Sequence, residues 1–173
     1  MPTGLKSASS TVAIGFAVTE TAANTFTQGS VDLNLDPLNN EVFVVQAINL
    51  DVTRPDGQAG ADSSSTAALT TTSQLAAAAV PGLDNSNTLA FIRSSITAAG
   101  FADSGIGFTN QSMETPASGL EYIGIIATND FFIQVEGFQN TGIKTVSGKL
   151  YGYRARADAS VYAALVQSEV LSA

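Results

Sequence analysis

The side chains that carry acid–base and nucleophilic chemistry are sparse in this sequence. Its 173 residues include no His and no Cys, which excludes a Ser-His-Asp triad, a Cys-His pair, a zinc-thiolate site and an imidazole metal site. Two carboxylates can serve a glycosidase, but no acidic pair stands in a recognisable local motif. We therefore expect no enzyme activity, and a carboxylate-based hydrolase remains a rival interpretation.

One short acidic motif is a candidate metal site. Asp32, Asn34 and Asp36 form D-x-N-x-D, which is how an EF-hand loop begins. The match ends there, because Pro37 takes the place of the required Gly and Phe43 that of the bidentate Glu. On a strand the three side chains share one face near a turn, which suggests a weak, irregular Ca²⁺ site and no other cofactor. The alternative is a polar outer face that ends in an Asx-type turn.

Four of the seven basic residues gather between positions 144 and 156, in the segment KTVSGKLYGYRAR. A strand there places Lys149, Tyr151 and Tyr153 on one face, and aromatic residues interleaved with cations can stack on bases or other ligands. The alternative is an edge strand whose cations prevent wrong pairing or meet acidic residues of a neighbouring subunit. The candidate interaction residues are Lys144, Lys149, Tyr151, Tyr153, Arg154 and Arg156.

Charged residues make up 13% of the chain, against about 25% in ordinary globular domains, and the mean hydropathy is positive at +0.19. Apolar surface without a charged cover marks contact with partners, so we expect a large homo-oligomer made of copies of this chain. The alternative is a monomer covered by Ser, Thr, Asn and Gln. A net charge of −8 also predicts no strong autonomous nucleic-acid binding.

The length fits a single domain over residues 1–173. We find no run of 18 apolar residues and no convincing signal peptide at the start, so we expect neither a membrane span nor secretion by a classical signal. The absence of Cys suits synthesis in the cytoplasm.

Alternating apolar residues predict several β-strands. The first covers residues 12–18, and a second runs from 26 to 35. The segment 41–52 is apolar on both faces at its start, so we expect a central strand covered on both sides. Strict alternation divides that segment into one face with Val42, Val44, Ile48, Leu50 and Val52, and another with Phe43, Val45 and Ala47.

Loops and further strands follow. Residues 53–65 and 100–119 are predicted as exposed loops and 66–74 as a weaker strand; LAAAAV at 75–80 suits a helical turn or a packed loop. Residues 86–99 fit a strand better than a helix. We expect a hairpin of 121–127 with 131–138, a strand over 145–157 and a helix over 158–171. This order predicts an all-β, antiparallel two-sheet sandwich or single jelly roll with a short C-terminal helix.

The order of these features resembles that of a single jelly-roll viral capsid protein. The resemblance rests on the long strand EVFVVQAINLDV at 41–52, STAALTTTSQ at 65–74, the hairpin EYIGIIATNDFFIQVEGF at 121–138 and the strand KLYGYRARA at 149–157. It implies an icosahedral shell of many copies, lateral contacts through loops and termini, and no catalytic site. Unlike many capsid proteins that bind their genome, the chain begins with MPTGLKSASS, which contains one basic residue.

These observations predict a structural protein that assembles into a shell as a viral major capsid protein. It would be synthesised in the host cytoplasm and located in the virion, with the loops 53–65 and 100–119 as contact or display regions. The alternative is an oligomeric β-sandwich binding or decoration module, for example for carbohydrate, in which tyrosine rings supply stacking platforms.

Overall fold

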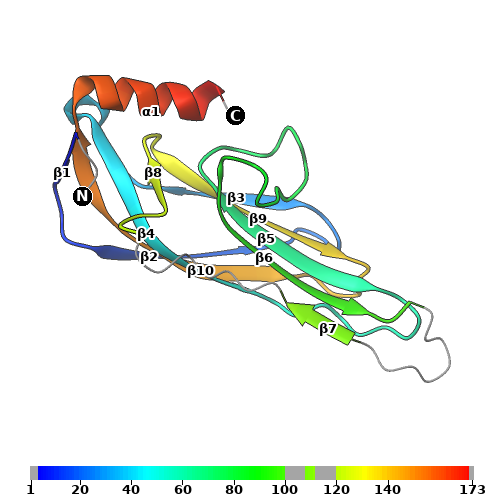
Figure 1. The fold of residues 1–173 in the computed structure, drawn as a ribbon. Coiled ribbons are helices and arrows are strands. Elements are labelled where there is room, and N and C mark those ends of the chain that lie inside the picture. The colour runs from blue at the N-terminus through cyan, green and yellow to red at the C-terminus, as the bar shows by residue number, and fades with distance from the viewer. Residues whose placement is uncertain (1–3, 100–107, 112–119, 172–173) are drawn as a thin grey trace.

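The computed structural model describes residues 4–99, 108–111 and 120–171, and within these ranges most of the chain is β-strand (Figure 1). Two antiparallel sheets face each other, and one α-helix follows the last strand. In chain order the elements are β1 Leu5–Ser7, β2 Val12–Thr19, β3 Thr27–Asp32, a 3-10 helix Pro37–Asn39, β4 Glu41–Val52, β5 Ser63–Thr70, β6 Thr88–Thr97, β7 Phe108–Gln111, β8 Gly124–Ile126, β9 Asp130–Phe138, β10 Thr145–Ala157 and α1 Ala159–Leu171.

The strand order is that of a jelly roll. Sheet A runs β2–β10–β4–β8, with β1 continuing the β2 edge along β10, and sheet B runs β3–β9–β5–β6–β7. When β1 and β7 are set aside, the first of the remaining strands pairs with the last, the second with the seventh, the third with the sixth and the fourth with the fifth. This nesting arises when one long antiparallel ribbon folds over into two sheets. The expected all-β, two-sheet antiparallel fold is therefore confirmed.

The main hydrophobic core fills the space between the two sheets. Sheet A contributes residues such as Phe43 and Leu150, and sheet B contributes Leu69 and Phe131, all of them fully buried. The ring of Phe16 meets that of Phe131 edge to face, with 5.7 Å between centroids, a favourable aromatic geometry. Strand β9 shows the alternation that this arrangement requires, because Phe131, Ile133 and Val135 belong to the core while Gln134 and Glu136 point to the other face.

Strand β4 lies between β10 and β8 and contains a β-bulge. Tyr151 of β10 pairs with Ala47, but the next residue, Gly152, pairs with Val45, so Gln46 is the extra residue of β4. A bulge leaves one residue unpaired and reverses the alternation of faces beyond it. The Gln46 side chain at the bulge is exposed.

The bulge makes the predicted division of β4 into two faces wrong. Phe43 and Val45 lie in the sandwich core together with Ile48, whereas Val42 and Val44 lie on the opposite face of sheet A, against α1. The expectation that β4 is central and covered on both sides is confirmed, because all four residues before the bulge are buried.

Helix α1, predicted over 158–171 and confirmed, covers the outer face of sheet A at one end of the sandwich (Figure 1). At its start the backbone N–H of Asp158 donates to the carbonyl of Gly4. Near its end the buried carboxylate of Glu169 accepts hydrogen bonds from the backbone N–H groups of Ala127 and Thr128 at 2.8–3.2 Å. The helix is thus fastened to β1 at one end and to the β8–β9 connection at the other.

Two predictions of local structure are wrong. The segments 121–127 and 131–138 do not form a hairpin, because β8 pairs with β4 in sheet A while β9 pairs with β3 and β5 in sheet B; the short connection crosses from one sheet to the other. The predicted loop 53–65 ends early, because Ser63–Ser65 are buried residues of β5. Small serines fit there between β6 and β9.

Other local predictions have clearer outcomes. The choice of strand over helix for 86–99 is confirmed by β6, and the strands at 12–18 and 145–157 correspond to β2 and β10. The segment LAAAAV forms exposed turns. Of the predicted loop 100–119, only residues 108–111 are described, as the strand β7, and the remainder lies outside the described residues.

Replacing Gly152 by Ala tests the packing of β10 against β4. A Cβ atom at this position would meet the carbonyl oxygen of Val44 and the ring of Phe43, so we expect the free energy of unfolding to fall by about 3 kcal/mol. Gly15→Ala is the matched control, because its added Cβ has no atom within 4 Å. Urea unfolding measures both, and equal stability of the two variants would contradict this packing.

Replacing Glu169 by Gln tests the attachment of α1. Burial raises the pKa of the Glu169 carboxyl, while the N–H groups of Ala127 and Thr128 act in the opposite direction. Because the pKa of Glu169 is higher in the folded state, this group contributes most to the free energy of unfolding below its unfolded-state pKa of about 4.3. That contribution is lost as pH rises through the folded-state pKa of Glu169. We expect this loss in the wild type and its absence in Glu169→Gln. Urea unfolding across this pH range would contradict the account if the two proteins changed in parallel.

Candidate functional site

The outer face of β10 carries three of the predicted interaction residues. Lys149, Tyr151 and Tyr153 alternate with the core residue Leu150 and with Gly152, which confirms that they share a face. The strand itself is not at an edge, because it pairs with β1 and β2 on one side and with β4 on the other. The alternative of an edge strand protected by cations is therefore wrong.

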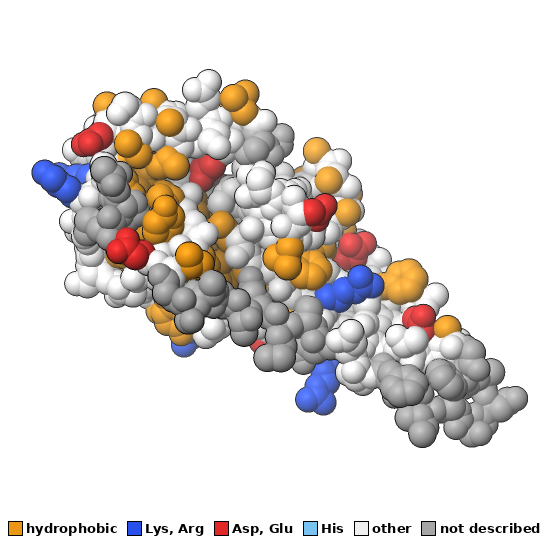
Figure 2. Space-filling model, viewed as in Figure 1, with side chains coloured by type: hydrophobic (Ala, Val, Ile, Leu, Met, Phe, Trp, Pro, Cys, Tyr) orange, Lys and Arg blue, Asp and Glu red, His pale blue; other side chains and the backbone are white. Residues whose placement is uncertain are grey.

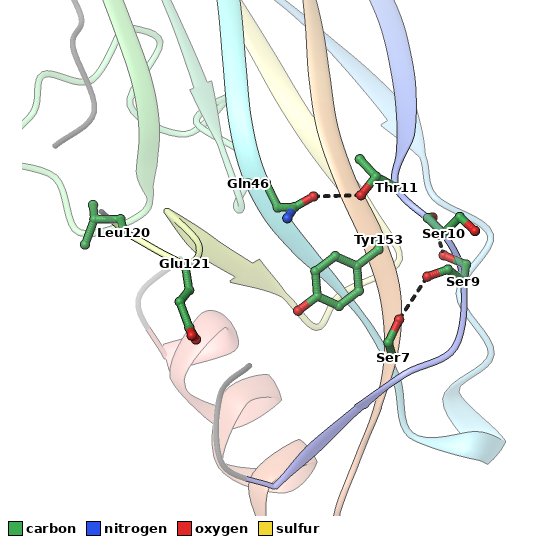
Figure 3. Close-up of a pocket in the computed structure, with 8 residues that line it drawn as sticks. All are labelled: Ser7, Ser9, Ser10, Thr11, Gln46, Leu120, Glu121 and Tyr153. Carbon is green, nitrogen blue, oxygen red and sulfur yellow. Dashed lines mark hydrogen bonds between the residues drawn. The ribbon is translucent and has the colours of Figure 1, made fainter. Parts of the chain in front are cut away.

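An open depression with a volume of about 610 Å³ lies beside Tyr153 (Figure 3). Two irregularities of sheet A shape it on either side of β10. One is the break between β1 and β2, where the Oγ of Ser9 accepts from the N–H of Arg154. The other is the β4 bulge, where the hydroxyl of Thr11 donates to the amide oxygen of Gln46 at 3.0 Å. Bulges commonly redirect a side chain at such positions.

This depression is polar and carries one acidic group. Its walls present hydroxyl groups, the Gln46 amide and the Glu121 carboxylate around the half-buried ring of Tyr153 (Figure 3). The residues that line it include no Lys or Arg. Such a surface can stack on a flat apolar ring face and hydrogen-bond to hydroxyl groups. Sequence reasoning identified Tyr153 but missed Gln46, which becomes available only through the bulge.

The two arginines of the basic segment do not join this face. Arg154 alternates with Tyr153, and its guanidinium donates to the carbonyl of Leu33 at 2.8 Å and lies 3.7 Å from the carboxylate of Glu41. Arg156 is exposed on the same side of β10. Five of the six predicted interaction residues are therefore divided between the two faces of sheet A.

Lys144 is not a surface residue. Its side chain is 3% exposed, and its Nζ donates to Oδ1 of Asp56 at 2.7 Å. The other Asp56 oxygen accepts from the N–H and hydroxyl of Thr141 and from the N–H of Gly142. The Lys144 ammonium and these donors hold the pKa of Asp56 well below its usual range. The interaction role predicted for Lys144 is thus replaced by a structural ion pair between two loops.

Further buried polar groups surround this ion pair at the same end of the sandwich. The Glu20 carboxylate accepts from the N–H groups of Thr25, Gly137 and Lys144. The amide of the buried Asn140 donates to the carbonyl of Ser64 at 2.8 Å. Buried polar groups that are all hydrogen-bonded stabilise one arrangement of the chain, so this cluster fixes the loops that leave β2, β4 and β9.

Asp32 and Asp36 each accept a hydrogen bond within a local turn. Oδ1 of Asp32 accepts from the N–H of Asn34, and that of Asp36 accepts from the N–H of Leu38. Hydrogen bonding by Asn39 lowers the pKa of Asp36. Among the described residues, no cluster of three His, Cys, Asp or Glu side chains could hold a metal ion. The arrangement supports the alternative of Asx-type turns, and the Ca²⁺ site stays a prediction.

A second candidate surface lies on the outer face of sheet B. The loop between β5 and β6 has a tip, residues 75–83, with the uncharged sequence LAAAAVPGL, and we call it the apolar loop. Leu75 is 65% exposed and Leu83 is 72% exposed. The base of the loop is fixed, because the N–H of Gln74 donates to the Gln28 side chain, and Gln134 donates to the hydroxyl of Thr70. Sequence reasoning missed this surface because the run fitted a helical turn or a packed loop equally well.

No family model and no curated protein matches the chain. In the described ranges, no helix has the length and apolar character needed to span a bilayer.

Replacing Asp56 by Asn tests the buried ion pair. The change leaves the Lys144 charge without its partner, and we expect unfolding to become easier by about 2 kcal/mol near neutral pH, since Asp56 keeps partial exposure. Because the folded pKa of Asp56 is lowered, its contribution is present above the unfolded value of about 3.9 and is lost as pH falls. The wild-type advantage should therefore shrink in acid. The exposed Asp51→Asn is the control, and an equal effect of both changes in urea unfolding would refute the ion pair's role.

Proposed function

We propose that this chain is a structural protein that assembles with copies of itself into a shell, as a viral major capsid protein does. In this account it is synthesised in the host cytoplasm and ends in the virion. The observation that carries the proposal is the exposure of the apolar loop. Leu75 and Leu83 are 65% and 72% exposed, although the protein has a well-packed core in which other apolar side chains are buried. Exposed apolar patches of this kind mark contact surfaces.

The distribution of apolar side chains over the surface supports the same proposal. Figure 2 shows hydrophobic side chains over α1, beside it over sheet A, and in the other half of the molecule, where acidic and basic side chains lie among them. Among the exposed apolar residues, Val170 and Leu171 lie at the end of α1, and Phe138 lies at the end of β9. A subunit of a closed shell needs more than one contact surface, because each copy must meet several neighbours.

Three carboxylates that are hydrogen-bonded within the fold also favour a structural role over catalysis. Glu20 and Glu169 each accept hydrogen bonds from backbone N–H groups, and Asp56 is paired with Lys144. Each of these groups fixes a loop or the helix. Carboxylates that work as general acids or nucleophiles need access to a substrate, and these are engaged within the fold.

Sedimentation velocity of the wild type and of the double variant Leu75→Ser, Leu83→Ser tests the proposal. We expect large particles from the wild type and smaller species from the double variant, because the serines remove apolar area from the contact. Leu38→Ser is a matched control at a leucine that is 93% exposed elsewhere, and it should assemble normally. A wild type that stays monomeric across concentration and salt would refute the shell.

The depression beside Tyr153 favours a second candidate, an oligomeric binding module for a neutral saccharide. Its aromatic ring, hydroxyl groups, amide and single carboxylate match the groups that bind sugars. This candidate predicts a discrete small oligomer. Titration with neutral oligosaccharides, followed by tyrosine fluorescence in the wild type and in Tyr153→Ala, distinguishes it, since the Tyr-dependent response should vanish in the variant.

A further inference from the structure

Strand β2 forms a long edge of sheet A that has a neighbour on one side only. It pairs with β10 from Val12 to Thr19, and within the described part of the chain no other strand pairs with it (Figure 1). A sheet edge presents a row of unpaired backbone N–H and C=O groups, which is a template for another strand.

The register with β10 shows which backbone groups of β2 face this edge. The N–H of Glu20 donates to the carbonyl of Lys144, one step beyond the last pair of the ladder, Thr19 with Thr145. Hydrogen-bonded and non-hydrogen-bonded pairs alternate along an antiparallel ladder. The even-numbered residues of β2 therefore bond to β10, and the odd-numbered residues turn their N–H and C=O groups outward. These residues are Ala13, Gly15, Ala17 and Thr19.

Strand β2 lacks the features that usually protect a free edge, which are charged residues, Pro and β-bulges. Its sequence, VAIGFAVT, contains no charge and no Pro, and its register with β10 runs without a shift. It has eight residues, against six in β3, four in β7 and three in β8 at the other described edges. It therefore offers the longest ladder to a partner strand.

The core-facing side chains of β2 are incompletely covered. Ile14, Phe16 and Val18 pack against the main core but are only half-buried. On the neighbouring strand β10, Val146 and Leu150 are fully buried. The difference arises because β10 has strands on both sides. A further strand at the β2 edge would bury more apolar area on these three side chains.

We propose that β2 pairs in antiparallel fashion with β2 of a second copy, so that sheet A continues from one subunit into the next. The inference rests on the proposed function and names one contact between subunits. The twofold axis is normal to sheet A and lies outside its edge, beside Phe16. This operation brings the two edges together side by side and keeps the core-facing side of each strand toward a core.

Overlap of the two strands along their length fixes the register. Phe16 then lies opposite Phe16 of the second copy, and Gly15 lies opposite Ala17. The odd-numbered residues meet in pairs that exchange N–H···O=C bonds, about eight in all. Their small side chains lie on the outer face and leave room for the neighbouring strand.

A second copy suits this edge better than an unstructured peptide does. Both β2 strands are already ordered against β10, so their pairing costs less conformational entropy. Chains that each carry a net charge of −8 repel one another. Because β2 has no charged residue, two copies of it meet without placing like charges in the ladder.

Cross-linking between copies tests the register. The chain has no Cys, so Gly15→Cys and Ala17→Cys each add one thiol, both at exposed positions. Opposite residues of a hydrogen-bonded pair have Cα atoms about 5.5 Å apart, within the range of a disulfide. The diagonal separations, 15 from 15 and 17 from 17, are about 7–8 Å. We expect a mixture of the two variants to form disulfide-linked dimers several-fold faster than either alone. Leu38→Cys, at a leucine that is 93% exposed outside β2, measures random collision.

Replacing Ala17 by Pro tests the same pairing without a cross-link. The change removes an N–H that faces the free edge and places a ring against the incoming strand, whereas the bonds to β10 remain. We expect association in sedimentation velocity to weaken at least about tenfold. Ala17→Ser is the matched control, because it keeps the N–H and a small side chain, and it should associate like the wild type.

The outcomes separate this contact from the shell. If the wild type assembles, Ala17→Pro assembles equally well and the thiol mixture links no faster than Leu38→Cys, the contact is refuted while the shell stands. If Ala17→Pro is weakened but the mixture does not link, the pairing is likewise refuted and the loss belongs to misfolding of the variant. Linked dimers without larger particles would support the contact and refute the shell. A wild type that is monomeric, with no linked dimers in the mixture, would refute both.

Discussion

Strand β10 is paired on both of its edges, with β1 and β2 on one side and with β4 on the other. This pairing joins the N-terminal segment, the centre of the chain and its last strand in one sheet. It requires close approach, because Gly148 and Gly152 lie where the rings of Phe16 and Phe43 and the backbone of β4 leave no room for a side chain. Before the bulge in β4, ordinary alternation places Phe43 and Val45 in the core and Val42 and Val44 on the opposite face, so sheet A needs a cover on its outer side.

The outer faces of the two sheets are covered to different extents. On sheet A the helix α1 supplies the cover, fastened at Gly4 and at the β8–β9 connection. On sheet B the base of the loop between β5 and β6 covers part of the face through Gln74 and Gln134, but the apolar loop itself extends outward. The molecule therefore combines a completed core with an exposed apolar surface, and this combination is the basis of the proposed assembly.

Much of the fold follows from period-2 alternation, whereas pairing between distant strands does not. The strands at 12–18, 41–52 and 145–157 were predictable because their apolar residues alternate or fill both faces. Sequence could not show the bulge, because Gln46 looks like any polar residue in a strand. It also could not show that β8 and β9 belong to different sheets, since a short turn serves a hairpin and a crossover equally well.

The candidate site was less predictable than the fold for a related reason. Lys144 shares a basic segment with Lys149, but it is buried beside Asp56, which is 88 residues away in the chain. The depression beside Tyr153 likewise joins Thr11, Gln46 and Glu121, which are far apart in the sequence. Both arrangements depend on tertiary pairing, and neither leaves a local motif.

Electron cryomicroscopy of the purified, unmodified chain tests the central claim most directly, because it shows which surfaces are covered by neighbouring copies. The account predicts closed particles in which the apolar loop and the outer face of sheet B are buried between subunits. Particles with this surface facing solvent on every copy, or a field of single subunits, would contradict it.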